Sequence, residues 1–201
     1  MKISTREMAL VSLFTGLTAI GAFISIPVGP VPITLQTLFV LLGGIILGSK
    51  LGALSQIVYI ILGLVGVPIF AGFSGGLQTV LKPSFGFLIG FIFAAYVVGK
   101  MTEDSSQFTI HNSQFNKNNS NQKIISSKKI LVATIVGTLV IYVCGLPYMY
   151  FILNNVMNMG LSVWAVIKMG SLLFLPGDIL KIIIATIVGA KLIPIVRKNI
   201  Y

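Results

Sequence analysis

Long uncharged stretches dominate the pattern of hydrophobic and polar positions along the chain. They cover residues 8–49, 51–81, 83–99 and 130–167, and charged residues fall between them. A helix that crosses the hydrocarbon core of a bilayer needs roughly 20 predominantly apolar residues. Each stretch has room for at least one crossing, and the pattern therefore predicts an all-α integral membrane protein.

Breaks inside these stretches divide them into six predicted transmembrane helices. A cluster of proline and glycine interrupts the first stretch at residues 27–32, and Lys50 marks a tight turn. The predicted spans are residues 8–27, 33–49, 51–67, 84–100, 130–150 and 172–193. A polar segment rich in Asn, Ser and Lys, residues 101–128, is predicted to be a loop. The whole chain, residues 1–201, then forms a single membrane domain.

Composition and charge sharpen this prediction. Charged residues make up 9% of the chain, whereas soluble domains carry about 25%, so a soluble domain is excluded. The net charge of +10 does not indicate a nucleic-acid partner, because the basic residues lie between the apolar stretches as topology signals. With a cytoplasmic amino terminus, three of the 14 basic residues fall outside, namely Lys82, Lys168 and Lys181. The inside receives Lys2, Arg6, Lys50, Lys100, Lys117, Lys123, Lys128, Lys129, Lys191, Arg197 and Lys198. The asymmetry predicts a multi-pass protein of the plasma membrane with both termini and the loop 101–128 in the cytoplasm.

Asp178 and Lys181 are the strongest candidates for chemistry, because both lie within the last predicted span. An ionised side chain in the hydrocarbon region costs about 2.5 to 3.5 kcal/mol on insertion scales, so such residues face a cavity or one another. Their spacing of three places both on one helical face. A structural ion pair at a helix start is the alternative. Pro176 and Gly177 interrupt the helix, and exposed backbone inside a membrane favours a ligand site.

A glycine-rich segment, residues 71–83, lies on the same predicted outer side and carries Gln78 and Lys82. These two side chains bring an amide and a second cation to the candidate binding site. The alternative is that Lys82 anchors the chain at the interface and that Gln78 is a solvated loop residue.

A stripe of small side chains runs along the first predicted span. Four residues share one helical face, namely Ala9, Ser12, Gly16 and Ala19. Small stripes let helices approach closely within lipid. The stripe packs either against a helix of the same chain or against a partner.

Motifs for other chemistries are missing from the sequence. Cys144 is the single cysteine, and His111 stands alone in the polar segment, so we expect no metal site. The chain also has no ATP-binding motif. We therefore expect neither an enzyme nor a bound cofactor, and any active uptake must take its energy from partner subunits or from an ion gradient.

Four segments resemble the BioY family, the biotin-specific substrate-binding components of energy-coupling factor (ECF) transporters. They are GPVPITLQTL (29–38), LGSKLGALSQIVYIILGLVGVPIFAG (47–72), GGL followed by PSFGFLIGF (75–91), and LPGDILK (175–181). The resemblance implies six helices, a biotin pocket beneath a lid between the third and fourth spans, and a complex with one transmembrane coupling subunit and two ATPases. ATP is then used only by the partner subunits.

The resemblance also implies roles for individual residues. It assigns biotin contacts to Asp178 and Lys181, and it places the stripe of the first helix against the coupling subunit. Gly72, Gly75 and Gly76 give the segment the backbone freedom expected of a lid. Candidate aromatic residues to cover the biotin bicycle are Phe70, Phe73, Phe85 and Tyr148. A component for a different vitamin and a membrane-embedded enzyme using Asp178 remain as alternatives.

Overall fold

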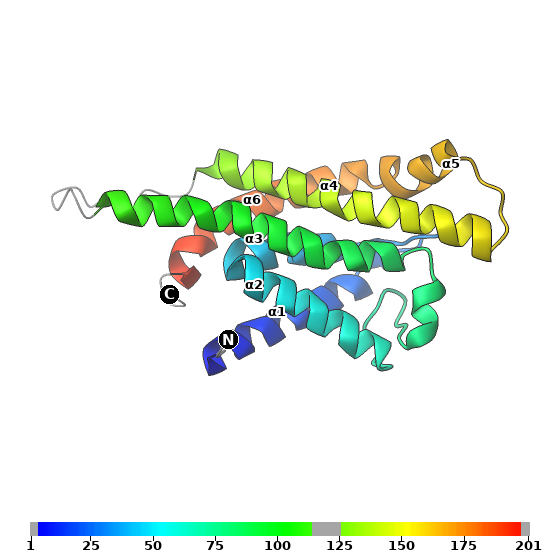
Figure 1. Cartoon of the computed structure of the whole chain (residues 1–201), viewed down its shortest axis with the longest axis horizontal. Helices are drawn as coiled ribbons and strands as arrows, with labels where there is room; N and C mark the ends of the chain where they lie inside the picture. The colour runs from blue at the N-terminus through cyan, green and yellow to red at the C-terminus, as the bar shows by residue number, and fades with distance from the viewer. Residues whose placement is uncertain (1–3, 114–125, 198–201) are drawn as a thin grey trace.

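The structure is a computed structural model that describes residues 4–113 and 126–197. These residues form a bundle of apolar helices (Figure 1). The main helices are α1 (Thr5–Phe23), α2 (Gln36–Leu64), α3 (Phe85–Ser113), α4 (Ser127–Phe151), α5 (Val163–Ile167) and α6 (Leu175–Arg197). Three short helical turns join them, namely η1 (Leu77–Leu81), η2 (Ile152–Val156) and η3 (Lys168–Leu172). Two antiparallel strands, β1 (Ser25–Ile26) and β2 (Ile33–Thr34), pair Ser25 with Thr34 in the connection from α1 to α2.

The two halves of α2 correspond to the second and third predicted spans. Gly48 interrupts the helix with φ +83°, a conformation that glycine adopts without a steric penalty. In a continuous helix, Gly44 and Gly52 would be about 12 Å apart along the axis. A Cβ added to Gly52 would instead lie 3.0 Å from the Gly44 Cα. The chain therefore folds back on itself here, two residues before the turn predicted at Lys50.

A carboxylate from α3 caps the start of the second half of α2. Glu103 Oε1 accepts a hydrogen bond from the Ser49 backbone N–H (2.7 Å), and Glu103 Oε2 accepts one from the Ser49 hydroxyl (2.8 Å). Backbone N–H groups at a helix start have no partner within the helix. The cap thus satisfies one of them inside an apolar bundle.

The predicted loop 101–128 is wrong at its beginning, because α3 continues to Ser113. No proline or glycine follows Lys100 in this stretch to end the helix, and Thr102 donates to the carbonyl groups of Val98 and Gly99 within the same helix. His111 accordingly lies within a helix rather than in a loop. Lys117 and Lys123 lie outside the described residues.

The connection between α4 and α6 contains more helix than predicted. Asn154 closes it locally, because its side chain accepts from the Leu161 N–H (2.6 Å) and donates to the Leu161 carbonyl (3.0 Å). After α5 and η3, the chain bends by 41° before α6 begins at Leu175 rather than at the predicted residue 172. The bend supplies the interrupted helix that Pro176 and Gly177 suggested.

Helices long and apolar enough to cross a membrane account for most of the described chain. They are α1, α2, α3 and α4, together with the bent pair of residues 163–172 and 175–193. With the two halves of α2 counted separately, they follow the order of the six predicted helices. The outer faces of the bundle carry large apolar side chains such as Leu139, Val143 and Ile187. This surface suits contact with lipid.

Buried apolar side chains form two clusters. The cavity cluster comprises Ala19, Val31, Val40, Tyr59, Ile60, Phe70, Phe85, Phe87, Leu88, Phe91, Ala94, Ala95, Ile141, Met149, Leu153, Val166 and Phe174. The terminal cluster comprises Val11, Phe14, Leu41, Leu42, Ile45, Ile46, Leu47, Leu51, Val98, Ile130, Ala133, Ala185 and Ile193. The start of α1 and the end of α6 lie toward the same end of the bundle, opposite η1 (Figure 1).

Candidate functional site

A cavity of about 340 Å³ lies in the part of the bundle surrounded by the cavity cluster. Its walls come from the connection between α1 and α2, the glycine-rich segment (71–83), and helices α2, α3, α4 and α6. Apolar side chains predominate, among them Phe70, Phe87, Leu88, Phe91, Ile141 and Phe174, while the polar groups include Thr34, Gln36, Thr138, Tyr142, Asp178 and Lys181. Pockets for small molecules have this size and this mixture of an apolar wall with a few polar groups.

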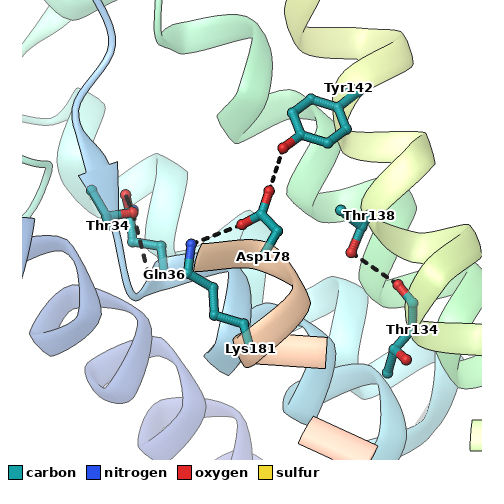
Figure 2. A network of polar contacts seen from close by, with 7 residues as sticks. All are labelled: Thr34, Gln36, Thr134, Thr138, Tyr142, Asp178 and Lys181. Carbon is teal, nitrogen blue, oxygen red and sulfur yellow. Dashed lines mark hydrogen bonds and ion pairs between the residues drawn. The ribbon is translucent and has the colours of Figure 1, made fainter. Parts of the chain in front are cut away.

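Asp178 and Lys181 lie together in the wall of this cavity, and both are almost fully buried. Lys181 Nζ donates to Asp178 Oδ1 at 2.9 Å (Figure 2). Asp178 is in the first turn of α6, where the positive end of the helix dipole favours a carboxylate. The neighbouring Ile179 and Leu180 point to the outer surface, where they are more than half exposed. The ion pair that was one alternative exists, and the same pair lines a cavity.

Tyr142 of α4 completes the environment of the Asp178 carboxylate. Its hydroxyl donates to Asp178 Oδ2, so that each carboxylate oxygen has a donor (Figure 2). Sequence analysis missed Tyr142, because a tyrosine within an apolar run carries no signal for a partner 36 residues away. A tyrosine hydroxyl in the middle of a predicted span does, however, need a hydrogen-bond partner, which is a usable hint.

Thr34 and Gln36 form a second polar group in the cavity wall. The Thr34 hydroxyl donates to Gln36 Oε1 (3.0 Å), and Gln36 Nε2 donates to the Tyr59 hydroxyl (2.8 Å). Both residues lie in the segment GPVPITLQTL that carries the family resemblance, but their roles were not predicted. Two polar residues within such a segment were the signal available.

The structure separates Lys82 from Gln78. Lys82 is exposed and lines the cavity, whereas Gln78 does not belong to the lining. Gln78 Nε2 donates to the Gly75 carbonyl (2.6 Å) within its own segment. The structure thus leaves Gln78 outside the cavity, on the helical turn η1.

Of the four candidate aromatic residues, Phe70 alone lines the cavity. Phe73 is 68% exposed and stacks on Phe23 with ring centroids 4.6 Å apart. Phe85 is buried in the cavity cluster without lining the cavity, and the Tyr148 hydroxyl donates to the Val80 carbonyl of η1. Sequence reasoning missed the aromatic residues that do line the cavity from α3 and before α6, namely Phe87, Phe91 and Phe174.

Gly72, Gly75 and Gly76 shape the segment that borders the cavity without lining it themselves. Gly72 and Gly76 have φ values of +70° and +89°, which disfavour any side chain. Gly75 packs so closely against the Val67 carbonyl that an added Cβ would collide with it. The Gly76 N–H donates to the Gly63 carbonyl (2.7 Å), which ties the segment to the end of α2.

The predicted stripe on α1 divides into two parts. Ala9, Ser12 and Gly16 are exposed, and a Cβ added to Gly16 would meet nothing within 4 Å. Ala19 is 9% exposed and belongs to the cavity cluster. Ala19 therefore packs within the chain, while the other three form an open surface.

The described residues contain no group of three or more His, Cys, Asp or Glu side chains placed to hold a metal ion. The thiol of Cys144 is free and partly exposed on α4. The polar lining of the cavity consists of one carboxylate, two lysines, hydroxyl groups and an amide, set in an apolar wall.

A bundle of membrane-length helices around a small-molecule cavity, with a buried charge pair in its wall, defines a membrane protein that binds a small polar ligand. The chain belongs to the BioY family, which it matches over residues 1–198. It is 38% identical over 194 residues to a probable biotin transporter BioY of Lysinibacillus sphaericus, covering 96% of this chain and 90% of the relative. The biotin transporter BioY of Thermotoga maritima is 32% identical, with 93% and 95% covered.

A solved structure shares the fold. The crystal structure of the S-component for biotin from an ECF-type ABC transporter matches with a TM-score of 0.73 and 25% sequence identity. The match covers 93% of this chain and 90% of that protein. Both kinds of comparison extend over nearly the whole chain, so the helices and the cavity lie within the shared region.

Proposed function

We propose that this protein captures biotin as the substrate-binding component of an ECF-type transporter in the plasma membrane. The observation that carries the proposal is the cavity with Asp178, Lys181 and Tyr142 buried in its wall, in a chain of the BioY family. The names of the relatives and of the solved structure support biotin as the ligand. They also support a transport protein rather than an enzyme.

The chemistry of biotin matches the distribution of polar groups. Its ureido ring offers two N–H donors and one carbonyl acceptor. Asp178 has lone pairs left to accept and Lys181 has N–H groups left to donate, whereas the single O–H of Tyr142 is donated to Asp178. The bicyclic ring is apolar and suits the phenylalanine wall of Phe70, Phe87 and Phe91. A lone ligand carboxylate is best placed at the solvent-accessible rim, where Lys82 lies. The buried pair therefore holds the ureido end, and Lys82 holds the acid end.

The charge distribution supports an orientation in the membrane. The start of α1 and the end of α6 lie at the same end of the bundle, as an even number of crossings requires (Figure 1). Lys50, Lys100, Lys128 and Lys129 are exposed and belong to the basic group predicted to face the cytoplasm. Under the positive-inside rule, both termini face the cytoplasm and the cavity opens outward.

The exposed part of the small stripe supports a docking surface for the transmembrane coupling subunit. Ala9, Ser12 and Gly16 leave the backbone of α1 accessible to a close helix partner. In the arrangement that the family resemblance implies, two ATPase subunits on that partner supply the energy for uptake. The bound vitamin is transported and is not a cofactor.

Equilibrium binding with radiolabelled vitamins tests the proposed ligand. Purified full-length protein in detergent is titrated with biotin and, in parallel, with thiamine, riboflavin and folate. We expect saturable binding of biotin alone, at one site per chain. Tight binding of another vitamin with none of biotin would favour a component for that vitamin, and release of a modified product would favour an enzyme.

A further inference from the structure

Two loops that are far apart in the sequence border the cavity together. The sheet loop, residues 24–35, contributes Val31 and Thr34, and the glycine-rich segment contributes Ala71, Ser74 and Thr79. A ligand in the cavity meets both loops. Contacts that link the two loops would make both become ordered together when a ligand binds.

A chain of hydrogen bonds joins these loops through the wall of the cavity. Gln36 accepts from the Thr34 hydroxyl (3.0 Å) and donates to the Tyr59 hydroxyl (2.8 Å). The Tyr59 hydroxyl in turn donates to the carbonyl of Ile69 (2.9 Å), two residues before the glycine-rich segment. This series of hydrogen bonds begins in β2, crosses between the two halves of α2 and ends just before the glycine-rich segment.

Because these hydrogen bonds are buried, the loss of one side chain weakens the others. Gln36 is 4% exposed and Tyr59 is 0% exposed, so neither has water as an alternative partner. Hydrogen bonds in such surroundings strengthen one another, and removal of one group leaves its neighbours unpaired. The ring of Tyr59 also meets Phe70 edge to face, with centroids 5.4 Å apart at 76°, and Phe70 lines the cavity.

We propose that Tyr59 is a positioning residue that couples the sheet loop to the glycine-rich segment. Tyr59 does not itself line the cavity, whereas Gln36 does. A ligand held against Gln36 orients the amide, the amide orients the Tyr59 hydroxyl, and the hydroxyl holds the carbonyl of Ile69. Ligand binding thereby orders both loops together. The inference rests on the proposed function for its ligand, biotin.

Hydrogen–deuterium exchange on the full-length protein, with and without saturating biotin, tests the coupling in Tyr59→Phe. This variant keeps the ring that packs on Phe70 and removes the hydroxyl. In the wild type we expect biotin to slow exchange in residues 25–34 and 69–80. In the variant, protection should remain in residues 25–34 and be clearly reduced in residues 69–80, with affinity about tenfold weaker. Tyr96→Phe, at a half-exposed position of α3, is the matched control and should behave as the wild type.

The same experiment separates coupling from plain structural support. Full protection of both segments in Tyr59→Phe at saturating biotin would overturn the proposal, even if the ligand-free variant were less stable. If that variant does not fold, Gln36→Met breaks the chain one step earlier and leaves the bond from Tyr59 to Ile69 intact. Retained protection of residues 69–80 in Gln36→Met would also overturn it. A wild type that does not bind biotin would instead contradict the proposed function.

Discussion

Glu103 and Asp178 are two carboxylates in the same apolar bundle, and their surroundings differ. Glu103 meets the backbone N–H and the hydroxyl of Ser49 at the break in α2, close to the terminal cluster. Asp178 meets side chains from two helices, Lys181 and Tyr142, in the wall of a cavity. The Glu103 carboxylate caps a helix start by accepting hydrogen bonds there, whereas the Asp178 carboxylate belongs to a polar surface that is open to a ligand.

The packing around the two carboxylates follows the same division. The terminal cluster contains one aromatic side chain, Phe14, and is otherwise aliphatic. Close helix contacts fill this region, such as Gly189, where an added Cβ would lie 2.7 Å from the Ile45 side chain. The cavity cluster is rich in phenylalanine and leaves about 340 Å³ of space beside it. A buried carboxylate thus indicates a ligand site when it borders space and is held by side chains from several elements.

The largest expected effect comes from breaking the pair at the cavity. Asp178→Leu and Lys181→Met each leave a buried charged partner without its counterion. We expect biotin binding to weaken by 2 to 5 kcal/mol, roughly 30-fold or more. Isothermal titration of the purified variants measures this loss. Near-wild-type affinity in both would assign the pair a purely structural role.

Tyr142→Phe tests the second donor to Asp178 with a smaller change. The ring remains and the hydroxyl is lost, so that Asp178 Oδ2 loses its donor. We expect biotin affinity to fall at least about tenfold, because a hydrogen bond to a charged group contributes about 1.5 to 3 kcal/mol. Tyr150→Phe, at a more exposed position of the same helix, provides the control. Equal affinities in the two variants would remove Tyr142 from the site.

Glu103→Ala tests whether the carboxylate at the break in α2 contributes to stability rather than to ligand binding. The change leaves the Ser49 N–H and hydroxyl without this acceptor, and we expect a loss of about 1.5 to 3 kcal/mol in stability. Thermal unfolding monitored in detergent measures that loss, and Glu103→Gln, which keeps one acceptor, should lose less. Biotin affinity of the folded variants should stay at the wild-type value. A selective loss of affinity would mean that the two carboxylates are not functionally separate.

Gly16→Leu should have the smallest effect on the isolated protein. Space around Gly16 accommodates a larger side chain, so stability and biotin binding should not change. Co-purification with the coupling subunit and ATP-dependent uptake should fall, because bulk on the stripe keeps the partner helix away. Ala19→Leu, on the buried part of the stripe, should instead lower stability. Unchanged uptake by Gly16→Leu would contradict docking through this surface.

Much of the helical arrangement was predictable, because each apolar stretch must satisfy its backbone within a helix when it enters a membrane. The placement of Asp178 and Lys181 on one helical face followed from their spacing, and their ion pair was one of two predicted alternatives. The continuation of α3 to Ser113 did not, since polar residues such as those after Lys100 are compatible with loop and helix alike. The break in α2 was placed two residues late, because Lys50 signals a membrane boundary whereas Gly48 permits the turn.

By itself, the sequence determined the class of protein, the number of apolar helices and the two charged residues of the last span. These features depend on the length and composition of uncharged stretches and on spacings within one helix, which are local. The tertiary structure alone decided that Tyr142 contacts Asp178, that Gln36 and Tyr59 link two loops, and that Phe73 and Gln78 stay outside the cavity. These contacts join residues on different elements or on the two halves of α2, and the side-chain directions that create them depend on how the helices rotate and pack against one another.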